Sequence, residues 1–291
     1  MAGVLVSMKN KMTPTMPAAC APHSNSSQSE PLKEKLVHAS NLKSISRTHE
    51  LQASLNAAVP PGTRARPFPQ HFVPLRTPEG FAALKNAESV KGFHSVAPVF
   101  QGQGPLQCGP TSLTVALNSL KLIDPRSTER AHSLHFDKDN IVAVFRSLLR
   151  PAHPFFSVSL DEVGKLAEYY VKLTPSSRVC VSTVHTNETT CEKFRRQAAS
   201  TLRNGGMVIV NFSRAHAGYT TSPFAGHMSP IVAYNKDNDS VLLMDVAIKS
   251  WEPVWIPVSS LFDAMDTVAE PRNSSKKDTS SKRGFILFER I

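Results

Sequence analysis

Long apolar runs are missing from this chain of 291 residues, although 41% of its residues are hydrophobic. No run approaches the roughly 18 residues that a helix needs to cross a bilayer, so we expect a soluble protein. Cysteine is also scarce, with four residues in the chain and no C-x-x-C pair among them. That spacing argues against a zinc ribbon and against a dense disulfide scaffold.

The beginning of the chain lacks acidic residues and arginine, since the first of each are Glu30 and Arg47. Residues 1–75 are rich in Ser, Pro, Asn and Lys with little periodicity, so we expect a disordered basic extension. The late first arginine argues against a transit peptide, and no continuous apolar stretch indicates a secretory signal. We expect a cytoplasmic protein, or a mitochondrial one if the extension is nevertheless a transit peptide.

The positive charge of the chain is concentrated in two segments. The net charge is +10, of which residues 1–75 carry +5 and residues 272–283 carry +4, leaving +1 for the rest. A basic surface that binds nucleic acid is expected on a folded face or in a recognisable motif. We therefore expect neither nucleic acid nor membrane as a partner. A binding role for the extension alone is the weaker alternative.

Helical patterns dominate the first part of the remaining chain. From Cys108, apolar residues recur at helical spacing as far as Leu120, which predicts one buried stripe. Further helices are predicted at residues 140–149 and 192–203. Another is predicted from Ser159, where Glu162 three residues later completes a capping-box pattern.

Strand patterns dominate the second part. Short runs rich in Val, Ile and Leu cover residues 207–212, 228–234, 241–246 and 284–288, and residues 236–239 have the composition of a hairpin turn. Helices followed by an antiparallel sheet indicate an α+β domain with two lobes, which we place at residues 76–291.

Cys108 is the candidate nucleophile. It follows a loop of Gln, Gly and Pro and begins a predicted helix. The unpaired N–H groups and partial positive charge of a helix N-terminus favour thiolate over thiol. Because the thiolate is the reactive form, this position suits covalent catalysis.

A reactive cysteine needs a base, and the base needs a group that orients it. His227 lies where a predicted strand begins, and Asp245 lies at the end of the next apolar run. A carboxylate in such surroundings is costly unless it is paired. In a hairpin the start of one strand lies beside the end of the next, so we expect these two residues to meet. The order Cys, His, Asp is the papain-type arrangement.

Attack of the thiolate on a carbonyl also requires a donor for the developing oxyanion. The backbone N–H of Cys108 and the side-chain amide of Gln103 are our candidates. Gln101 and Gln107 remain alternatives for the side-chain donor.

Four segments resemble the phytochelatin synthase family. Phe100-Gln-Gly-Gln and Cys108-Gly-Pro-Thr-Ser-Leu are similar to the family's nucleophile segment, and Gly226-His-Met-Ser-Pro-Ile to its histidine segment. Leu243-Met-Asp-Val-Ala, followed by Trp255-Ile-Pro-Val, resembles the aspartate segment, and Lys282-Arg-Gly-Phe the closing strand. The similarity keeps its order over about residues 77–291.

The resemblance implies a papain-like fold and glutathione γ-glutamylcysteinyltransferase activity. Cys108 would attack the Cys–Gly bond of glutathione, release glycine and hold a γ-glutamylcysteinyl thioester. A second glutathione or a growing phytochelatin would accept the acyl group, with His227 as base and acid and Asp245 holding its tautomer. We expect glutathione and metal–glutathione complexes as partners, and leave a homodimer open.

The resemblance also implies a role for metals in the reaction. Cadmium, zinc and copper would activate it as metal–glutathione thiolates that serve as substrate, and no organic cofactor is implied. Ile248 stands where the family often has an arginine linked to substrate binding. On this resemblance we assign substrate binding to Gly226 and Lys249, with Arg214 as an alternative cation.

Two other interpretations stay open. A papain-like peptidase would pass the acyl group to water and remove glycine from glutathione or its S-conjugates. A non-enzymatic protein would sequester metal through its thiols. His132 and His135 could share a metal on a helix, and Cys180 and Cys191 could pair or bind a soft metal, but for these we expect ordinary structural roles.

Overall fold

The computed structural model describes residues 49–54, 56, 67–122, 136–149, 158–174, 178–219, 226–269 and 282–291. All of them fall within one unit of contacts, Ile45–Ile291. His132 and His135 lie outside the described residues, as does most of the extension predicted at residues 1–75. Within the described ranges, no helix has the length and apolarity needed to cross a membrane.

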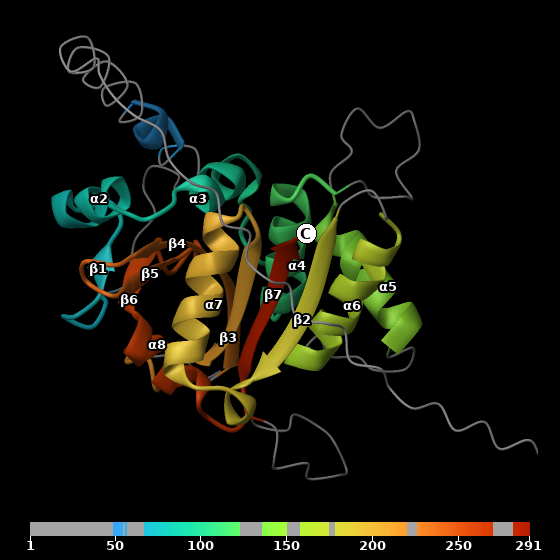
Figure 1. Ribbon diagram of the computed structural model, residues 1–291. Coiled ribbons are helices and arrows are strands. Elements are labelled where there is room, and N and C mark those ends of the chain that lie inside the picture. Colours follow the sequence, from blue (N-terminus) through green and yellow to red (C-terminus); the bar gives the residue numbers. More distant parts are fainter. Residues whose placement is uncertain are drawn as a thin grey trace, which may run out of the picture. The chain divides into compact units, whose positions relative to one another are not determined.

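Most of the helices come first in the chain and most of the strands later, and Figure 1 shows where they lie. The helices are α2 (Pro78–Lys85), α3 (Lys91–Val96), α4 (Cys108–Ser119), α5 (Lys138–Leu149), α6 (Leu160–Lys172), α7 (Cys191–Arg203) and α8 (Val258–Met265). The strands are β1 (Val73–Pro74), β2 (Val179–His185), β3 (Met207–Ser213), β4 (Gly226–Asn235), β5 (Ser240–Leu243), β6 (Val254–Pro257) and β7 (Gly284–Arg290). The expected α+β class, with an antiparallel sheet after the first helices, is confirmed.

The described strands form one seven-stranded antiparallel sheet in the order β1-β6-β5-β4-β3-β7-β2. The predicted hairpin joins β4 and β5, with Asn235 opposite Ser240. The sequence did not predict β2, which pairs with β7 at the edge of the sheet. Its mixture of Val, Ser, Thr and His lacks the apolar run that marks the inner strands.

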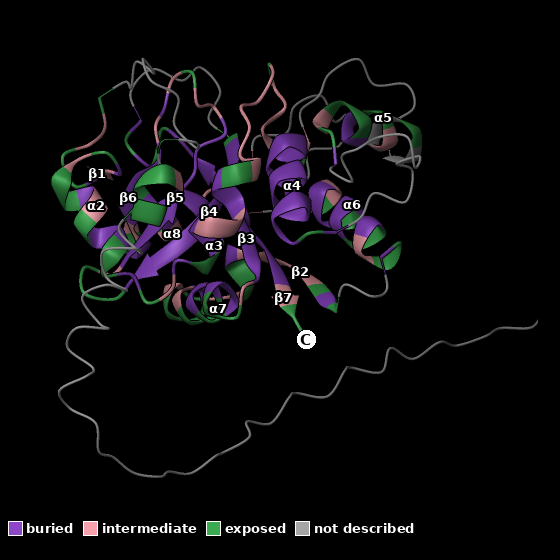
Figure 2. Ribbon diagram, turned by 90° about the horizontal axis from the view of Figure 1, so that it is seen from above, coloured by how far each residue is buried: buried purple, intermediate pink, exposed green. Residues whose placement is uncertain are grey.

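Helices cover both faces of this sheet. Successive side chains of a strand point to opposite faces. Met207 and Ile209 of β3 join the apolar cluster of α3, α4 and α6, whereas Val208 and Val210 join the cluster of α7 and α8. Figure 2 shows α7 on one side of the sheet and α4 and α6 on the other. Burial on both faces explains why the first four residues of β3, Met207–Val210, are all apolar.

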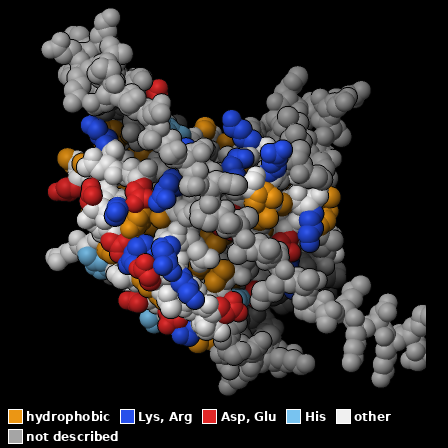
Figure 3. Space-filling model, viewed as in Figure 1, with side chains coloured by type: hydrophobic (Ala, Val, Ile, Leu, Met, Phe, Trp, Pro, Cys, Tyr) orange, Lys and Arg blue, Asp and Glu red, His pale blue; other side chains and the backbone are white. Residues whose placement is uncertain are grey.

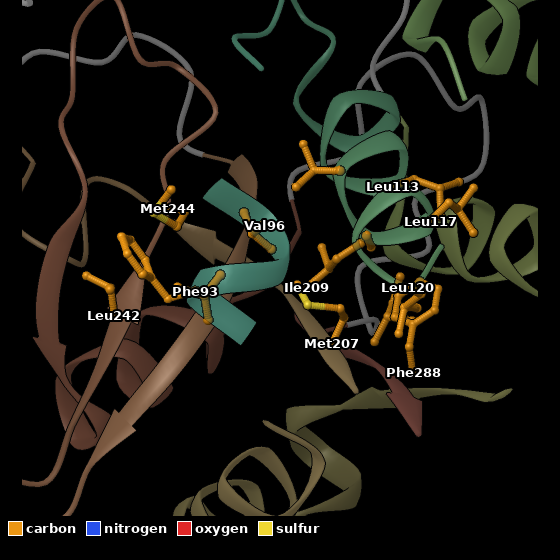
Figure 4. Close-up of a cluster of buried hydrophobic side chains, with 14 of the residues drawn as sticks. Phe93, Val96, Leu113, Leu117, Leu120, Met207, Ile209, Leu242, Met244 and Phe288 are labelled. Carbon is orange, nitrogen blue, oxygen red and sulfur yellow. The ribbon is translucent and has the colours of Figure 1, made fainter. Parts of the chain in front are cut away.

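Helix α4, which begins with the candidate nucleophile Cys108, is buried on every side. The sequence predicted one apolar stripe, but all residues from Gly109 to Ser119 are buried. The helix contacts the sheet through β4 and β3 and is flanked by α3, α5 and α6. In Figure 4, Leu113 and Leu117 point into the apolar cluster around α4, and Leu120 lies beside Phe288. This packing fixes the start of the helix, where Cys108 lies.

The other predicted helices are confirmed with small changes in their ends. Residues 140–149 fall within α5, and residues 192–203 within α7. The Ser159 hydroxyl accepts from the Glu162 N–H at 3.2 Å, and the Glu162 carboxylate accepts from the Ser159 N–H at 2.7 Å. This is the predicted capping box, and it fixes the start of α6.

Packing against the sheet begins before residue 76. Val73 and Pro74 pair with β6, and the flanking side chains of Phe72 and Leu75 are 4% and 0% exposed. Leu51, in the helical residues 49–54, is 1% exposed and joins the cluster around α4. The described fold thus extends into the segment that we assigned to the extension.

Charges of both signs alternate on the face that carries α7. Figure 3 shows Lys and Arg beside Asp and Glu there. Arg195 of α7 binds Asp239 through two bonds of 2.7 and 2.8 Å, and Arg203 binds Glu88 at 2.7 Å. These ion pairs tie α7 to the β4–β5 turn and to the segment before α3.

Candidate active site

Cys108 is the first residue of α4 and is half-buried. The N-cap residue Gln107 makes no side-chain cap, so the partial positive charge of the helix end acts on the thiol. The next residue must be small, because a Cβ on Gly109 would lie 2.3 Å from Cγ2 of Val158. Glycine here lets the segment before α6 pack closely beside the nucleophile.

His227 is the second residue of β4, opposite Phe212 of β3. Its ring stands edge-on to the Phe212 ring at 5.6 Å and is 2% exposed. The hydroxyl of Ser112 in α4 donates to the carbonyl of Met228 at 3.1 Å, which joins the helix to β4 beside the histidine. The Cys108 thiol lies close enough to the His227 ring for each group to shift the pKa of the other.

Asp245 lies two residues beyond the end of β5 and is fully buried. Its Oδ1 lies 2.8 Å from Nε2 of His227 and accepts from the N–H of Ala247 at 2.8 Å. The N–H of Met244 donates to the carbonyl of Pro230 at 2.9 Å, so pairing with β4 continues past the strand. The hairpin register therefore brings His227 and Asp245 together, and α4 brings Cys108.

Two further polar groups face Nε2 of His227. Nη2 of Arg214 and Oγ of Ser229 each lie 2.9 Å from it. Nη2 of Arg214 also donates to both oxygens of Asp245, at 2.9 and 3.0 Å. Because Nε2 faces these groups, Nδ1 is the ring nitrogen left for Cys108. Sequence reasoning missed Ser229, although it lies two residues after His227 and so shares its face of the strand.

The charges of these groups shift one another's pKa values. Burial alone would raise the pKa of Cys108, but the hydrogen bond and charge of His227 lower it overall. Burial would lower the pKa of His227, but the Asp245 carboxylate raises it overall. Burial would raise the pKa of Asp245, but the charges of His227 and Arg214 hold it far below its usual range. These shifts move Cys108 toward the thiolate and His227 toward the imidazolium, beside an ionised carboxylate.

The loop before α4 is fastened beside Asp245. The N–H of Gln103 donates to the carbonyl of Val246 at 2.7 Å, and a Cβ on Gly102 would lie 2.9 Å from Cγ2 of Ile248. The buried Oε1 of Gln103 has no hydrogen-bond partner among the described residues. No bond in that part of the chain joins the Gln103 amide to Cys108, so its oxyanion role stays a prediction.

The two residues assigned to substrate binding are both exposed. The side chain of Lys249 forms no hydrogen bond or ion pair within the described ranges. Gly226 precedes His227, and a Cβ on it would lie 3.2 Å from Nη1 of Arg283. Arg283 is 4% exposed, and its Nε donates to Oγ1 of Thr267 at 3.0 Å. The sequence marked this arginine only as part of the closing strand.

Comparison with known proteins identifies the family of this chain. The family model described as phytochelatin synthase matches residues 63–285. The chain belongs to the phytochelatin synthase family. The resemblance seen in the nucleophile, histidine and aspartate segments is thereby confirmed, and the matched residues contain Cys108, His227 and Asp245.

Curated relatives in the phytochelatin synthase family are longer than this chain. Glutathione gamma-glutamylcysteinyltransferase 2 of Arabidopsis thaliana is 32% identical over 207 residues, covering 69% of this chain and 40% of the relative. The Schizosaccharomyces pombe glutathione gamma-glutamylcysteinyltransferase is 24% identical and covers 64% of this chain and 40% of the relative. The chain thus spans about 40% of the length of these relatives.

Among solved structures, a C39-like peptidase from Bacillus anthracis is similar to part of this phytochelatin synthase family member. The TM-score is 0.39 and the sequence identity is 14%, with 66% of this chain and 94% of the peptidase covered.

Proposed function

We propose that this chain is a glutathione γ-glutamylcysteinyltransferase that forms phytochelatins in heavy-metal detoxification. One observation carries the proposal: in a chain of the phytochelatin synthase family, Cys108 lies beside His227, and Oδ1 of Asp245 lies 2.8 Å from Nε2 of that histidine. Nucleophile, base and orienting group therefore occur in the order that covalent acyl transfer requires.

In the first half-reaction, the Cys108 thiolate attacks the carbonyl carbon of the Cys–Gly bond in glutathione. A C–S bond forms, and the C–N bond breaks after the His227 imidazolium gives its proton to the leaving glycine nitrogen. The Cys108 N–H at the start of α4 is placed to donate to the oxyanion, with Gln103 as the proposed second donor. The products are glycine and a γ-glutamylcysteinyl thioester.

In the second half-reaction, the free amine of another glutathione, or of a growing phytochelatin, attacks the thioester. Neutral His227 takes the proton from that amine as the C–N bond forms, and the C–S bond breaks to restore the thiolate. Asp245 keeps the imidazole in one orientation throughout, because its Oδ1 lies 2.8 Å from Nε2. Glutathione and metal–glutathione complexes are thus the proposed partners.

We propose that cadmium, zinc and copper enter the reaction as part of the substrate. Thiolates are soft ligands that bind such metals tightly, so glutathione complexes form readily. In the described part of the chain, no group of three or more His, Cys, Asp or Glu residues is arranged to hold a metal ion. We propose that metal acts here through the thiol of the bound peptide.

The test is mass spectrometry of the protein after brief mixing with glutathione. We expect a γ-glutamylcysteinyl adduct on the peptide that contains Cys108, and release of one glycine for each adduct. Cys108→Ser should abolish both while the near-UV circular dichroism stays unchanged. Cys180→Ser is the matched control, because Cys180 is an exposed free thiol on β2 and should keep full activity.

One observation favours the hydrolytic alternative enough for it to be tested as well. Ile248 lies against the loop at Gly102, beside the site, where the family often has a substrate-binding arginine. With cadmium and excess glutathione, the transferase produces oligomers, whereas a hydrolase yields only γ-glutamylcysteine and glycine. A protein that merely sequesters metal would lose equal capacity in Cys108→Ser and Cys180→Ser and would release no glycine.

A further inference from the structure

We propose that Arg214 is a positioning residue, which holds the Asp245 carboxylate and sets the proton balance between Cys108 and His227. The proposal rests on the function proposed above, since it concerns the same catalytic groups. The sequence offered Arg214 only as an alternative cation for substrate. Its contacts give it a different role.

Arg214 follows β3 and is 8% exposed. One nitrogen, Nη2, donates to both oxygens of Asp245 at 2.9 and 3.0 Å and lies 2.9 Å from Nε2 of His227. The carboxylate is thus held between the guanidinium, the imidazole and the Ala247 N–H. A cation committed to these contacts acts through Asp245 rather than directly on substrate.

The aromatic surroundings support this orientation. The guanidinium carbon lies 5.9 Å from the centre of the Tyr219 ring, which also packs edge-on against Trp251 at 4.5 Å. The Nε of Arg214 and the hydroxyl of Tyr219 are buried and have no hydrogen-bond partner among the described residues. In the described part of the chain, Asp245 is therefore the carboxylate that orients the guanidinium.

A count of buried charges shows what Arg214 contributes. With Arg214 present, the catalytic state contains two cations, Arg214 and protonated His227, and two anions, Asp245 and the Cys108 thiolate. This state is neutral overall. Without Arg214, Asp245 and protonated His227 already cancel, so ionising Cys108 would leave the site with a net negative charge, which is costly beside buried groups. The charge of Arg214 lowers the pKa of both Cys108 and His227, so it favours the thiolate while working against the imidazolium.

This charge count includes every titratable or charged group that contacts Cys108 or His227 among the described residues. Cys108 comes from α4, Arg214 follows β3, and Asp245 follows β5, while the Tyr219 hydroxyl is neutral because burial raises its pKa well above the usual value. Ser229 and the Phe212 ring complete the surroundings of His227 without adding charge.

The experiment measures thiolate formation at Cys108 separately from catalysis. Iodoacetamide labelling of the full chain, followed peptide by peptide across pH, gives the titration midpoint of Cys108. We expect Arg214→Met to raise this midpoint and to slow labelling at pH 7, because the charge of Arg214 is among the causes that lower the pKa of Cys108. Arg214→Lys should show a smaller rise, because its ammonium falls short of the two carboxylate oxygens.

The matched control is Arg195→Met, which breaks the ion pair between Arg195 on α7 and Asp239 in the β4–β5 turn and, within the described residues, removes no bond to Cys108, His227 or Asp245. Its Cys108 midpoint should equal that of the wild type. Glycine release by Arg214→Met should fall in kcat at pH 7, because a smaller fraction of Cys108 is then ionised. Both limbs of its pH–rate profile should move to higher pH, with little change in KM.

The outcomes separate the two proposals. A folded Arg214→Met with a wild-type midpoint and wild-type pH limbs overturns the positioning role. If that variant does not fold, Arg214→Lys decides, and a wild-type midpoint together with a wild-type rate overturns the role. A midpoint shift in a protein that never releases glycine supports the positioning role and refutes the proposed reaction.

Discussion

The two described cysteines at helix starts show how much a residue's chemistry depends on its neighbours. Cys108 begins α4 and Cys191 begins α7. The helix end favours the thiolate at both positions. Yet His227 lowers the pKa of Cys108, whereas burial and the charges of Asp239 and Asp263 raise the pKa of Cys191 despite nearby Arg195. Helix position alone does not identify the nucleophile.

This contrast predicts selective alkylation. At pH 6.5–7, iodoacetamide should label Cys108 at least about tenfold faster than Cys191, because each pKa unit changes the thiolate fraction about tenfold. Peptide mass spectrometry over time measures both rates in one sample. His227→Ala should remove most of the difference. Equal rates in the wild type would contradict the thiolate–imidazolium pair.

Asp245 gives a second prediction at this scale, on acid stability. Its folded pKa is held below the unfolded value of about 3.9, so its contribution to stability is complete above that value and is lost as pH falls further. Asp245→Asn should lower the free energy of unfolding at pH 7 by about 3–5 kcal/mol, since Arg214 loses its partner.

Urea unfolding at several pH values checks this prediction. Below pH 4 the wild type should lose stability more steeply than Asp245→Asn, so that the two curves converge. Parallel curves would show that the carboxylate does not titrate with a lowered pKa in the folded state.

At the scale of elements, His185 at the end of β2 connects three segments. Its Nδ1 lies 2.6 Å from the carbonyl of Lys282 and its Nε2 lies 2.8 Å from Oδ1 of Asp161 in α6. Both partners can only accept, so both ring nitrogens must carry protons. Burial would lower the pKa of His185, but these bonds and the charges of Asp161 and Glu188 raise it overall.

A raised histidine pKa fixes the sign of the pH dependence. The stabilisation is complete below the unfolded value of about 6.5 and is lost as pH rises through the higher folded value. The gap in unfolding free energy between wild type and His185→Gln should therefore shrink between pH 6 and 8. Asp161 is 53% exposed, so we expect a gap below about 1 kcal/mol. A gap that grows with pH would refute the charged contact.

Much of the element structure could be predicted because its signals are local. The Ser159 cap, the turn at residues 236–239 and the apolar runs of β3 and β4 each specify their element without distant contacts. Edge strand β2 was missed because its partial burial left Ser and Thr among its valines. The complete burial of α4 was missed because it depends on which helices flank it.

The site divides in the same way. Cys108, His227 and Asp245 could be selected as candidates because each stands at the end of a recognisable element, and the structure places Nε2 of His227 2.8 Å from Oδ1 of Asp245. The position of Arg214 depends on the pairing of β3 with β4, where Phe212 faces His227. The sequence of the loop after β3 does not indicate that register. The contact between Arg214 and Asp245 could therefore be found only from the structure.

At the scale of the whole molecule, most of the excess positive charge lies in segments that contribute little to the fold of the described residues. The segments 1–75 and 272–283 hold +9 of the net charge of +10. In the residues from 67 onward, ion pairs such as Arg195–Asp239 and Arg203–Glu88 balance one another on the α7 face. The N-terminal segment nevertheless contributes apolar side chains to the core. Because their removal costs stability, they limit how far the N-terminus can be shortened.

Three truncations test where the folded part begins. Deleting residues 1–44, which lie outside the unit Ile45–Ile291, should leave the melting temperature and glycine release unchanged. Deleting residues 1–66 removes buried Leu51 and should cost about 1.5–3 kcal/mol. Deleting residues 1–76 also removes Phe72, Leu75 and β1, for a combined loss of about 4–9 kcal/mol.

The largest of these losses is comparable with the 5–15 kcal/mol that holds a typical domain together, so the shortest protein should be mostly unfolded at 37 °C. Thermal melts followed by circular dichroism give the ranking, and glycine release follows it because Cys108, His227 and Asp245 meet only in the folded sheet. A 77–291 fragment that melts like the full chain would show that β1 and its flanking side chains contribute no stability. The folded unit would then begin where the sequence alone placed it.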